Sequence, residues 1–238
     1  MLFENKKIVI IGGSSGIGFA IAKAALIEGA NVIIASRSID KLEHAKHKLN
    51  GAIEAHPLDL LQEESIKSFF KKVGSFDHLQ LPGSEVRFGN IDTLSIEDAR
   101  YSFDSKFWGP YIAIKHAREY LSKQGSITLY SGAASQRPTK ESTILTALNA
   151  SVEALSRALA ISLTPIRVNV ISPGITMTPL FEDMGKEQAD KILDTYKSNL
   201  LVKRFATADE VAQTAIYLMS NEYVTGSLHM IDGGLSVT

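Results

Sequence analysis

The segment from residue 8 to residue 28 contains the feature that most limits how this chain can fold. Residues 8–11 are four consecutive β-branched aliphatic residues, a glycine-rich turn follows over 12–18, and an alanine-rich helical pattern runs over 17–28. A short run that is apolar at every position is typical of a strand buried on both faces, as in a parallel sheet. The order of strand, glycine turn and helix therefore predicts the first unit of an α/β domain.

Apolar runs and helical patterns continue to alternate along the rest of the chain. Further strands are expected at 31–35, 52–56, 76–81, 126–130, 167–171 and 228–231, and further helices at 41–49, 63–73, 95–122, 142–163 and 209–219. Gly109 and Pro110 predict an irregularity within 95–122, and Thr207 is expected to cap the last helix. Strands that alternate with helices form parallel sheets with right-handed crossovers. We therefore expect one doubly wound Rossmann-type α/β domain over 1–238, with about seven parallel strands flanked by helices.

The composition excludes several classes of function. The chain has 238 residues and a formal net charge of -1, so nothing global favours binding to nucleic acid or to an acidic membrane surface. There is no cysteine, which excludes disulfides, thiolate chemistry and cysteine-ligated metals. The six histidines form no metal-binding pattern, and His44 and His47 lie on a polar helical segment typical of a surface. We expect no metal site.

No targeting or membrane segment is expected. Residues 1–7 contain no basic region followed by a long apolar stretch, which is the pattern of a signal peptide. No apolar run approaches the ~20 residues of a membrane span. The content of 45% hydrophobic and 21% charged residues is that of a soluble globular protein. These observations favour a cytoplasmic location and no membrane partner.

The glycine turn has a spacing that indicates a nucleotide site. Gly12, Gly16 and Gly18 are separated by three residues and one residue, which differs from the common G-x-G-x-x-G fingerprint but serves the same turn. Glycines permit close approach of the backbone to a pyrophosphate, and the helix N-terminus adds free N–H groups. Ser14 and Ser15 add hydroxyl donors. Cofactor binding is favoured, and the alternative is a turn that only packs the helix against the strand.

Several segments together give the chain a resemblance to a known family. The glycine turn with Ile17, Gly-Ser-Ile at 125–127, Ile-Arg-Val-Asn-Val-Ile-Ser-Pro-Gly at 166–174, Thr-Gly at 225–226 and Asp-Gly-Gly at 232–234 resemble the short-chain dehydrogenase/reductase (SDR) family. The resemblance covers essentially the whole chain. It implies a Rossmann fold, an oxidoreductase, a nicotinamide dinucleotide, a small-molecule substrate and a homodimer or homotetramer.

The same resemblance assigns further residues to the cofactor. It implies that the turn after the strand at 167–171 touches the nicotinamide and that the residues just beyond bond the carboxamide and the phosphates. These residues are Pro173, Gly174, Ile175, Thr176 and Thr178. Asp59 and Leu60 look like the adenine contact of the family. Gly83 looks like the close approach to the adenosine ribose, although the family usually has Asn-Asn-Ala-Gly where this chain has Gln-Leu-Pro-Gly at 80–83.

The end of the second strand indicates which dinucleotide is preferred. NAD-preferring members of this fold carry an acidic residue here for the ribose 2′-hydroxyl, whereas this chain reads Ser36, Arg37, Ser38. A guanidinium suits a 2′-phosphate because it makes charge-assisted, bidentate hydrogen bonds. We therefore favour NADP(H) over NAD(H), and the alternative is a solvated surface arginine.

The chain departs from the family at the positions of its catalytic Asn, Ser, Tyr and Lys. The flanking segments put Lys106, Gly132, Leu145 and Asn149 at these four positions. Ser131 precedes Gly132 and would restore a serine if the register slipped by one residue. No small slip restores the other two, because residues 141–155 contain neither tyrosine nor lysine. The catalytic residues are therefore unknown from the sequence.

Two tyrosines need a separate interpretation. Tyr111 and Lys115 have the Tyr-x-x-x-Lys spelling of the family. They precede the strand expected at 126–130, which leads to the family's serine position, whereas the family's tyrosine follows that strand. We therefore interpret them as ordinary helix residues. Tyr130 lies close to the predicted site, but its place inside a strand predicts a core residue.

Lys106 and Asn149 appear at the family's Asn and Lys positions, as if the two residue types had been exchanged. Our hypothesis is that the ammonium of Lys106 keeps one positive charge near the nicotinamide ribose. The alternative is a lysine that points to solvent. Residues 179–200 look helical but less regular, and the resemblance implies that this segment covers the substrate.

The sequence leaves three functions open. The first is an NADP(H)-dependent oxidoreductase for a small carbonyl or alcohol, in which Lys106, Ser131 or water supplies the proton. Losing a positioned acid costs about 10²–10⁴ in rate, which still leaves useful activity from binding and orientation. The second is a catalytically inactive NADP(H)-binding module, and the third is a regulatory or structural subunit of an SDR-like oligomer.

Overall fold

A seven-stranded parallel sheet forms the centre of the computed structural model, which describes residues 1–179, 194, 197 and 199–238. The strand order is β3-β2-β1-β4-β5-β6-β9. The strands are β1 (Lys7–Ile11), β2 (Asn31–Ser36), β3 (Ile53–Pro57), β4 (Phe76–Leu81), β5 (Leu121–Tyr130), β6 (Arg167–Pro173) and β9 (Leu228–Ile231). A second small sheet pairs β7 (Thr176–Met177) with β8 (Ala206–Thr207). The expected fold class is confirmed.

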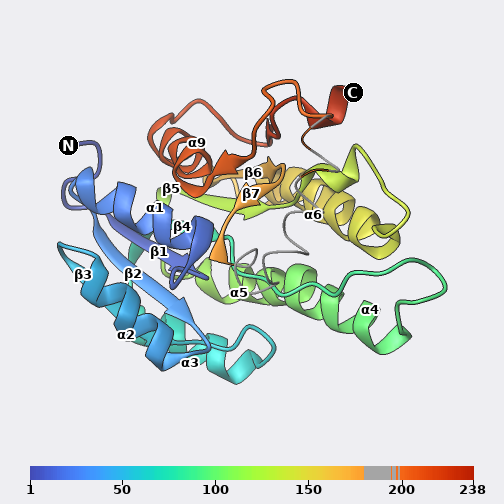
Figure 1. Cartoon of the computed structure of the whole chain (residues 1–238). Coiled ribbons are helices and arrows are strands. Elements are labelled where there is room, and N and C mark those ends of the chain that lie inside the picture. The colour runs from blue at the N-terminus through green and yellow to red at the C-terminus, as the bar shows by residue number, and fades with distance from the viewer. Residues whose placement is uncertain (180–193, 195–196, 198) are drawn as a thin grey trace.

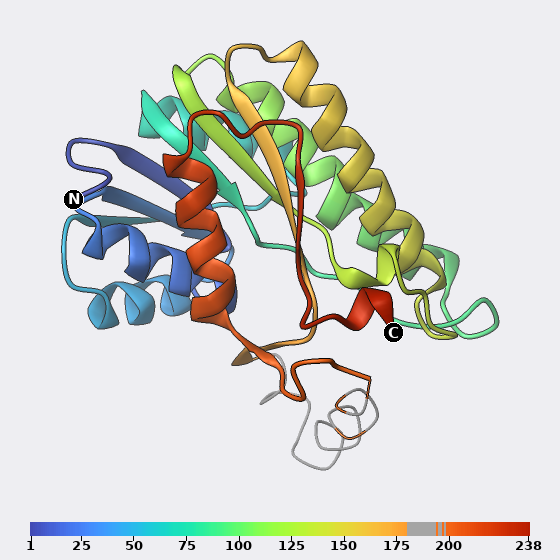
Figure 2. The ribbon, with the colours of Figure 1, turned by 90° about the horizontal axis from the view of Figure 1, so that it is seen from above.

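Helices cover both faces of the sheet (Figure 1). They are α1 (Gly16–Ile27), α2 (Ile39–Lys48), α3 (Glu63–Val73), α4 (Ile96–Phe103), α5 (Gly109–Ala117), α6 (Thr143–Ser162) and α9 (Ala208–Ser220). The helices α1, α2 and α9 share one hydrophobic core with the sheet, and α3, α5 and α6 share the other. Figure 2 shows the sheet between these two helical layers.

The first strand shows why its sequence is apolar at every position. Ile8 and Ile10 lie in the core under α1, α2 and α9, whereas Val9 and Ile11 lie in the core under α3, α5 and α6. Successive side chains of a strand point to opposite faces of the sheet. Because helices cover both faces, each of these positions is removed from water.

The strand order creates a topological switch point between β1 and β4. The strand β1 pairs with β2 on one side and with β4 on the other. The chain continues from β1 to β2 and from β4 to β5, so the two connections lead to opposite sides. In open α/β sheets, ligands bind beyond the carboxyl ends of the strands at such a point. The glycine turn after β1 and Gly83 after β4 lie at this edge.

One expected helix differs from the structure. The helix expected over 95–122 is divided into α4, a π-helical turn over Asp104–Trp108, and α5, which ends at Ala117. The irregularity lies in the turn before Gly109 rather than at Gly109 itself. The Gly109 N–H closes that turn on the carbonyl of Asp104. π-Helical turns often mark functional positions, and this one contains Lys106.

The fifth strand also starts earlier than expected. β5 begins at Leu121, which pairs with Phe76, and the register then shifts before His78 pairs with Ser126. A Cβ at Gly125 would lie 2.1 Å from the carbonyl oxygen of Asp77, so only glycine allows the two strands to approach here. This irregular pairing makes the strand longer than its apolar run indicates.

The helix α9 (Ala208–Ser220) begins at the cap that the sequence predicts. The Thr207 side chain accepts a hydrogen bond from the N–H of Glu210, whose carboxylate accepts the N–H of Thr207 in return. This reciprocal capping box satisfies two donors at the start of α9. The predicted cap is confirmed.

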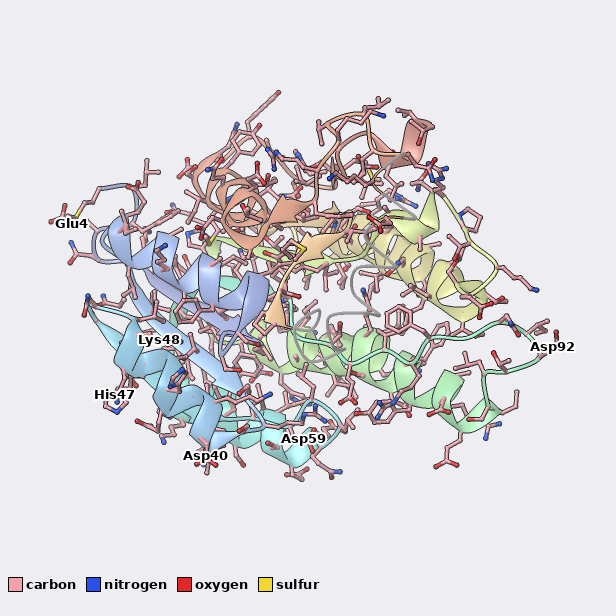
Figure 3. The ribbon with its side chains drawn as sticks, viewed as in Figure 1. Glu4, Asp40, His47, Lys48, Asp59 and Asp92 are labelled. Atoms are coloured by element: carbon pink, nitrogen blue, oxygen red, sulfur yellow. The ribbon has the colours of Figure 1, made fainter. Side chains whose placement is uncertain are left out.

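Two surface histidines and the apolar helix α6 also bear on the sequence predictions. His44 and His47 are exposed, as expected, and Figure 3 shows His47 on the outer side of α2. By length and composition alone the helix α6 could span a membrane, although Asn149, Glu153 and Arg157 interrupt its apolar residues. Its Leu148 and Val152 are buried against the sheet, and core helices of this kind pass the same test.

Candidate functional site

The turns after β1 and β4 touch through their backbones. The Gly12 N–H donates to the Ala35 carbonyl at 2.7 Å, and the Gly83 N–H donates to the Ile11 carbonyl at 2.9 Å. A Cβ at Gly12 would lie 2.3 Å from the Gly83 Cα, and one at Gly18 would lie 2.1 Å from the Gly12 carbonyl oxygen. Glycine is therefore required at these crossings.

The start of α1 offers unused hydrogen-bond donors. Its N-cap Ser15 makes no side-chain capping bond within the described residues, and its first turn contains no acidic residue. Gly16 has a φ of +53°, and a Cβ there would lie 3.3 Å from Cγ2 of Thr178. The structure thus brings Thr178 against the helix start. Free N–H groups and a positive dipole end form a site that fits a pyrophosphate.

The turn after β2 contains the predicted selectivity residues. Ser38 caps α2 by accepting the Lys41 N–H at 3.3 Å, and the Ser36 hydroxyl donates to the Ser38 carbonyl at 3.4 Å. The Arg37 side chain is 57% exposed but is not a free surface arginine, because it forms an ion pair with Glu85 at 2.8 Å. This hydrogen bond raises the pKa of Arg37 above its ordinary value. The proposed phosphate-binding group therefore already has a partner.

The turn after β3 is organised by its own aspartate. The Asp59 carboxylate accepts the Leu61 N–H at 3.0 Å, and the Asp59 N–H donates to the Ser65 hydroxyl at 3.2 Å. A Cβ at Gly109 would lie 3.0 Å from the Leu60 Cβ, so Leu60 packs on the start of α5. Figure 3 shows Asp59 at the sheet edge near α3. Its carboxylate shapes the turn in which an adenine contact is predicted.

Lys106 and Asn149 bind two consecutive carbonyl groups just beyond β5. Lys106 Nζ donates to the Ser131 carbonyl at 3.0 Å, and Asn149 Nδ2 donates to the Gly132 carbonyl at 3.3 Å. Burial lowers the pKa of Lys106 to about 8, and the nearby Glu153 carboxylate opposes this shift. The structure therefore excludes the alternative in which Lys106 points to solvent.

Three buried polar atoms around the ends of β5 and β6 have no hydrogen-bond partner within the described part of the chain. They are Ser131 Oγ, Asn149 Oδ1 and Ser172 Oγ. Ser131 and Ser172 follow the paired residues Tyr130 and Ile171 on neighbouring strands. Buried polar groups are nearly always paired with protein or ordered water. These atoms fit a polar ligand or bound water at this edge of the sheet.

The turn after β6 is held by backbone pairing. Pro173 pairs with Ile231 of β9, and the Gly174 N–H donates to the Ile231 carbonyl at 2.9 Å. The Ile175 carbonyl accepts from the first residue of β8 at 3.1 Å, and the Thr176 hydroxyl donates to the Gly174 carbonyl at 3.3 Å. The predicted nicotinamide turn therefore has a fixed backbone path.

The remaining predicted positions are also accounted for. Tyr111 and Lys115 are exposed on α5, as their interpretation as helix residues requires. Tyr130 is buried and its hydroxyl donates to Gln80 Oε1 at 2.7 Å, so it is a core residue. Leu145 is partly buried on α6. Most of the segment 179–200, which the resemblance places over the substrate, lies outside the described residues.

The structure adds functional candidates that the sequence did not reveal. Glu85, Arg87 and Tyr101 gather around Arg37, from a loop and a helix that carry no recognisable motif. Glu153 is buried near Lys106 and accepts hydrogen bonds from Ser135 at 2.5 Å and Gln136 at 3.4 Å. Its position four residues after Asn149, on the same face of α6, was the one available signal. Among the described residues, no group of three His, Asp or Glu side chains is arranged to bind a metal.

A glycine turn at the switch point of a parallel sheet, followed by a helix start that no described side chain caps, is typical of Rossmann-type dinucleotide-binding proteins. The family model for enoyl-(acyl carrier protein) reductase matches residues 12–236. The short-chain dehydrogenase/reductase ucsE of an Acremonium species is 32% identical, with 97% of this chain and 95% of that protein covered. The chain belongs to the short-chain dehydrogenase/reductase family of oxidoreductases.

Two solved structures support the same assignment. A small-chain dehydrogenase crystallised in complex with NADPH is 32% identical, has a TM-score of 0.82, and is matched over 98% of this chain and 99% of its own. The MalC reductase/Diels-Alderase from Malbranchea aurantiaca is 26% identical with a TM-score of 0.92, over 100% of this chain and 98% of its own. The SDR resemblance seen in the sequence is confirmed.

Proposed function

We propose that this chain is an NADP(H)-dependent oxidoreductase that transfers hydride to or from a small carbonyl or alcohol, with Lys106 as the proton donor. The family supplies the reaction class. The observation that carries the residue assignment is the 3.0 Å hydrogen bond from Lys106 Nζ to the Ser131 carbonyl. It holds a titratable ammonium beside the end of β5, at the sheet edge where ligands bind.

The cofactor would be held by the residues around the switch point. Gly12, Gly16 and Gly18 would receive the pyrophosphate at the N-terminus of α1, and Arg37 would face the 2′-phosphate. A related dehydrogenase crystallised with NADPH supports this preference. When bound, the dinucleotide supplies or accepts the hydride. The remaining chemistry, the movement of one proton, falls to side chains of the protein.

Lys106 has the properties of an acid-base group near neutral pH. Its pKa, lowered by burial to about 8, lies close to the operating pH, which is where a general acid works best. One N–H is used by the Ser131 carbonyl, and an ammonium has two more to offer. In reduction it would donate a proton to the carbonyl oxygen as hydride reaches the carbon. In oxidation the neutral amine would accept the hydroxyl proton.

This proposal keeps the register that puts Lys106, Gly132, Leu145 and Asn149 at the family's catalytic positions. Asn149 then carries no charge and instead holds the Gly132 carbonyl at 3.3 Å. Ser131 would supply the hydroxyl that other family members carry at the position of Gly132. Its Oγ atom is buried and has no partner within the described residues, which leaves it available to a substrate oxygen.

The second candidate is an NADP(H)-binding module without turnover, acting as a regulatory or structural subunit of an SDR-like oligomer. Leu145 favours it, because a leucine at the proposed tyrosine position cannot donate a proton. Residues 141–155 contain no tyrosine or lysine to replace it. In this candidate the glycine turn and Arg37 keep their roles, and Lys106 only fixes the end of β5.

A calorimetric titration with NADPH beside NADH, followed by a screen of small carbonyl compounds, tests both candidates. The proposed function predicts micromolar NADPH binding, weaker NADH binding and carbonyl reduction above the uncatalysed background. Tight NADPH binding with no turnover of any carbonyl would favour the binding module. No binding of either dinucleotide would contradict both candidates and direct the search to protein partners.

A further inference from the structure

A charged cluster at the predicted 2′-phosphate site contains its own carboxylate. Arg37 Nη2 donates to Glu85 Oε2 at 2.8 Å, and the Tyr101 hydroxyl donates to the same oxygen at 2.8 Å. Arg87 Nη2 lies 2.8 Å from the other carboxylate oxygen, Oε1. Arg37 Nη1 also donates to the Tyr101 hydroxyl at 3.3 Å. The Glu85 carboxylate therefore lies between two guanidinium groups, with one oxygen contacting Arg37 and the other contacting Arg87.

The loop that carries Glu85 and Arg87 is fixed to the helix beneath it. The Glu85 N–H donates to the Ser105 hydroxyl at 2.8 Å, and the Arg87 N–H donates to the Ser102 hydroxyl at 2.9 Å. Both serines are buried. In Figure 1 this loop runs from β4 along α4. Two backbone bonds, spaced two residues apart, thus set the path on which Glu85 and Arg87 are presented to Arg37.

The cluster has the chemistry of an anion receptor that is filled by a side chain. Planar guanidinium groups bind carboxylates and phosphates through the same paired N–H donors. Arg87 also stacks over the Tyr101 ring, 5.2 Å from its centroid, which holds it beside the cluster. Arg87 Nε also lies 3.9 Å from Asp98 Oδ1, so a second, more distant carboxylate faces this cluster. A phosphate dianion carries twice the charge of a carboxylate, so it would gain more from Arg37 and Arg87 than Glu85 does.

We propose that Glu85 is a specificity-determining residue that competes with the 2′-phosphate of NADP(H) for Arg37, with Arg87 as a second guanidinium for that phosphate. The inference rests on the proposed function, because it concerns the same dinucleotide site. Glu85 would move aside when the phosphate binds and would remain in place over the ribose of NADH. Its effect is therefore to narrow the preference for NADPH that Arg37 alone would give.

The expected effect is modest because the ion pairs are exposed. The side chains of Arg37, Glu85 and Arg87 are 57%, 34% and 49% exposed, and exposed ion pairs are individually weak. The hydrogen bonds and both arginines hold the pKa of Glu85 below its ordinary value, so the carboxylate stays charged at neutral pH. Removing its charge should raise the affinity for a 2′-phosphate about two- to fivefold.

The test is a calorimetric titration of the full chain with 2′,5′-ADP and with 5′-AMP, which differ only in the 2′-phosphate. E85Q should bind 2′,5′-ADP about two- to fivefold more tightly than the unchanged protein, and it should bind 5′-AMP with unchanged affinity. Y101F, which removes one hydrogen bond from Glu85, should give a smaller shift in the same direction. R87M in the E85Q background should weaken 2′,5′-ADP and leave 5′-AMP unchanged.

E64Q is the matched control, because Glu64 is an exposed carboxylate that is paired with Lys67 on α3. It should change neither affinity. Unchanged or weaker binding of 2′,5′-ADP by E85Q and Y101F would overturn the competition, and weaker binding of 5′-AMP by E85Q would instead make Glu85 a ribose ligand. If the competition fails but the unchanged protein binds NADPH, the proposed function stands. If the unchanged protein binds neither NADPH nor NADH, the proposed function fails as well.

Discussion

The two halves of the sheet edge are built differently. At the ends of β1, β2 and β4, backbones cross at glycines and the charged groups are exposed, as Gly12, Gly83 and Arg37 show. At the ends of β5 and β6, the polar groups are buried side chains, as Lys106 and Asn149 show. We call the ends of β1, β2 and β4 the glycine half, because glycine backbones set its shape. We call the ends of β5 and β6 the reaction half, because the side chains proposed to take part in the reaction lie there.

This difference explains how the two halves can change during evolution. A glycine crossing depends on backbone sterics, and almost any substitution there costs the fold itself. The side chains beyond β5 come from different elements, the π-helical turn and α6, so their residue types can be exchanged while the carbonyl groups they bind stay in place. The proposed register, with Lys106 at the family's Asn position and Asn149 at its Lys position, would be a change of this second kind.

The largest expected effect comes from breaking the glycine half. Gly12→Ala would place a Cβ 2.3 Å from the Gly83 Cα, at a φ of +95°. Steric overlap and backbone strain together should lower the free energy of unfolding by about 3 kcal/mol and weaken NADPH binding more than tenfold. Urea unfolding and calorimetric titration measure the two effects.

Gly74→Ala is the matched control for that substitution. Gly74 has a φ of +64° and a ψ of −152°, with nothing within 4 Å of an added Cβ. It therefore isolates the cost of a backbone conformation that favours glycine, about 1–3 kcal/mol. It lies after α3, away from the proposed site, and should leave NADPH affinity unchanged. Equal costs for the two variants would show that the crossing with Gly83 tolerates a side chain.

The sequence predicted the fold and the glycine half because both depend on local patterns. The alternation of apolar runs with helices gave the seven strands, and the spacing of Gly12, Gly16 and Gly18 located the turn. The helix at 95–122 failed because the π-helical turn and the long, irregular β5 have no local pattern. The early start of β5 depends on pairing with β4, where Gly125 meets Asp77.

The contacts of the reaction half could not be predicted from the sequence. The flanking residues gave the positions of Lys106 and Asn149, but the carbonyl that each one binds depends on how α6 packs against the end of β5. Glu85 was missed for a similar reason. Its partner Arg37 is 48 residues away, and only the strand order brings the ends of β2 and β4 to the same edge.

The second expected effect removes the proposed acid. Lys106→Met should lower kcat for carbonyl reduction by about 10²-fold or more, the range for loss of a positioned acid. Lys106 must be protonated to donate, so in the unchanged protein the rate should be constant at low pH and fall as pH rises through about 8. The variant should lose this limb of the pH–rate profile while NADPH titrations report any change in affinity.

Two variants separate this role from a structural one. Lys115→Met removes an exposed lysine of α5 and should leave rate and profile unchanged. Glu153→Gln removes the negative charge that raises the pKa of Lys106, so the alkaline limb should move to lower pH. A limb that stays at the same pH in both Lys106→Met and Glu153→Gln would mean that another group donates the proton.

The smallest expected effect compares two serines on either end of the same strand segment. Ser126 Oγ is hydrogen-bonded to Nδ1 of the buried His78 at 2.8 Å, whereas Ser131 Oγ has no partner within the described residues. Ser126→Ala should cost about 1–3 kcal/mol, because it leaves a buried histidine nitrogen unpaired. Ser131→Ala should leave the free energy of unfolding unchanged or raise it by up to about 1 kcal/mol, because no bond is lost.

The same pair of variants tests what the unpartnered hydroxyl is for. If Ser131 holds a substrate oxygen, Ser131→Ala should keep full stability and lose turnover, whereas Ser126→Ala should lose stability and keep turnover per folded molecule. Urea unfolding and carbonyl reduction, measured on both variants, give the comparison. A stability cost in Ser131→Ala equal to that of Ser126→Ala would mean that its hydroxyl is already satisfied in the free protein. The reaction half would then be structural, and the binding module would be the better reading of this chain.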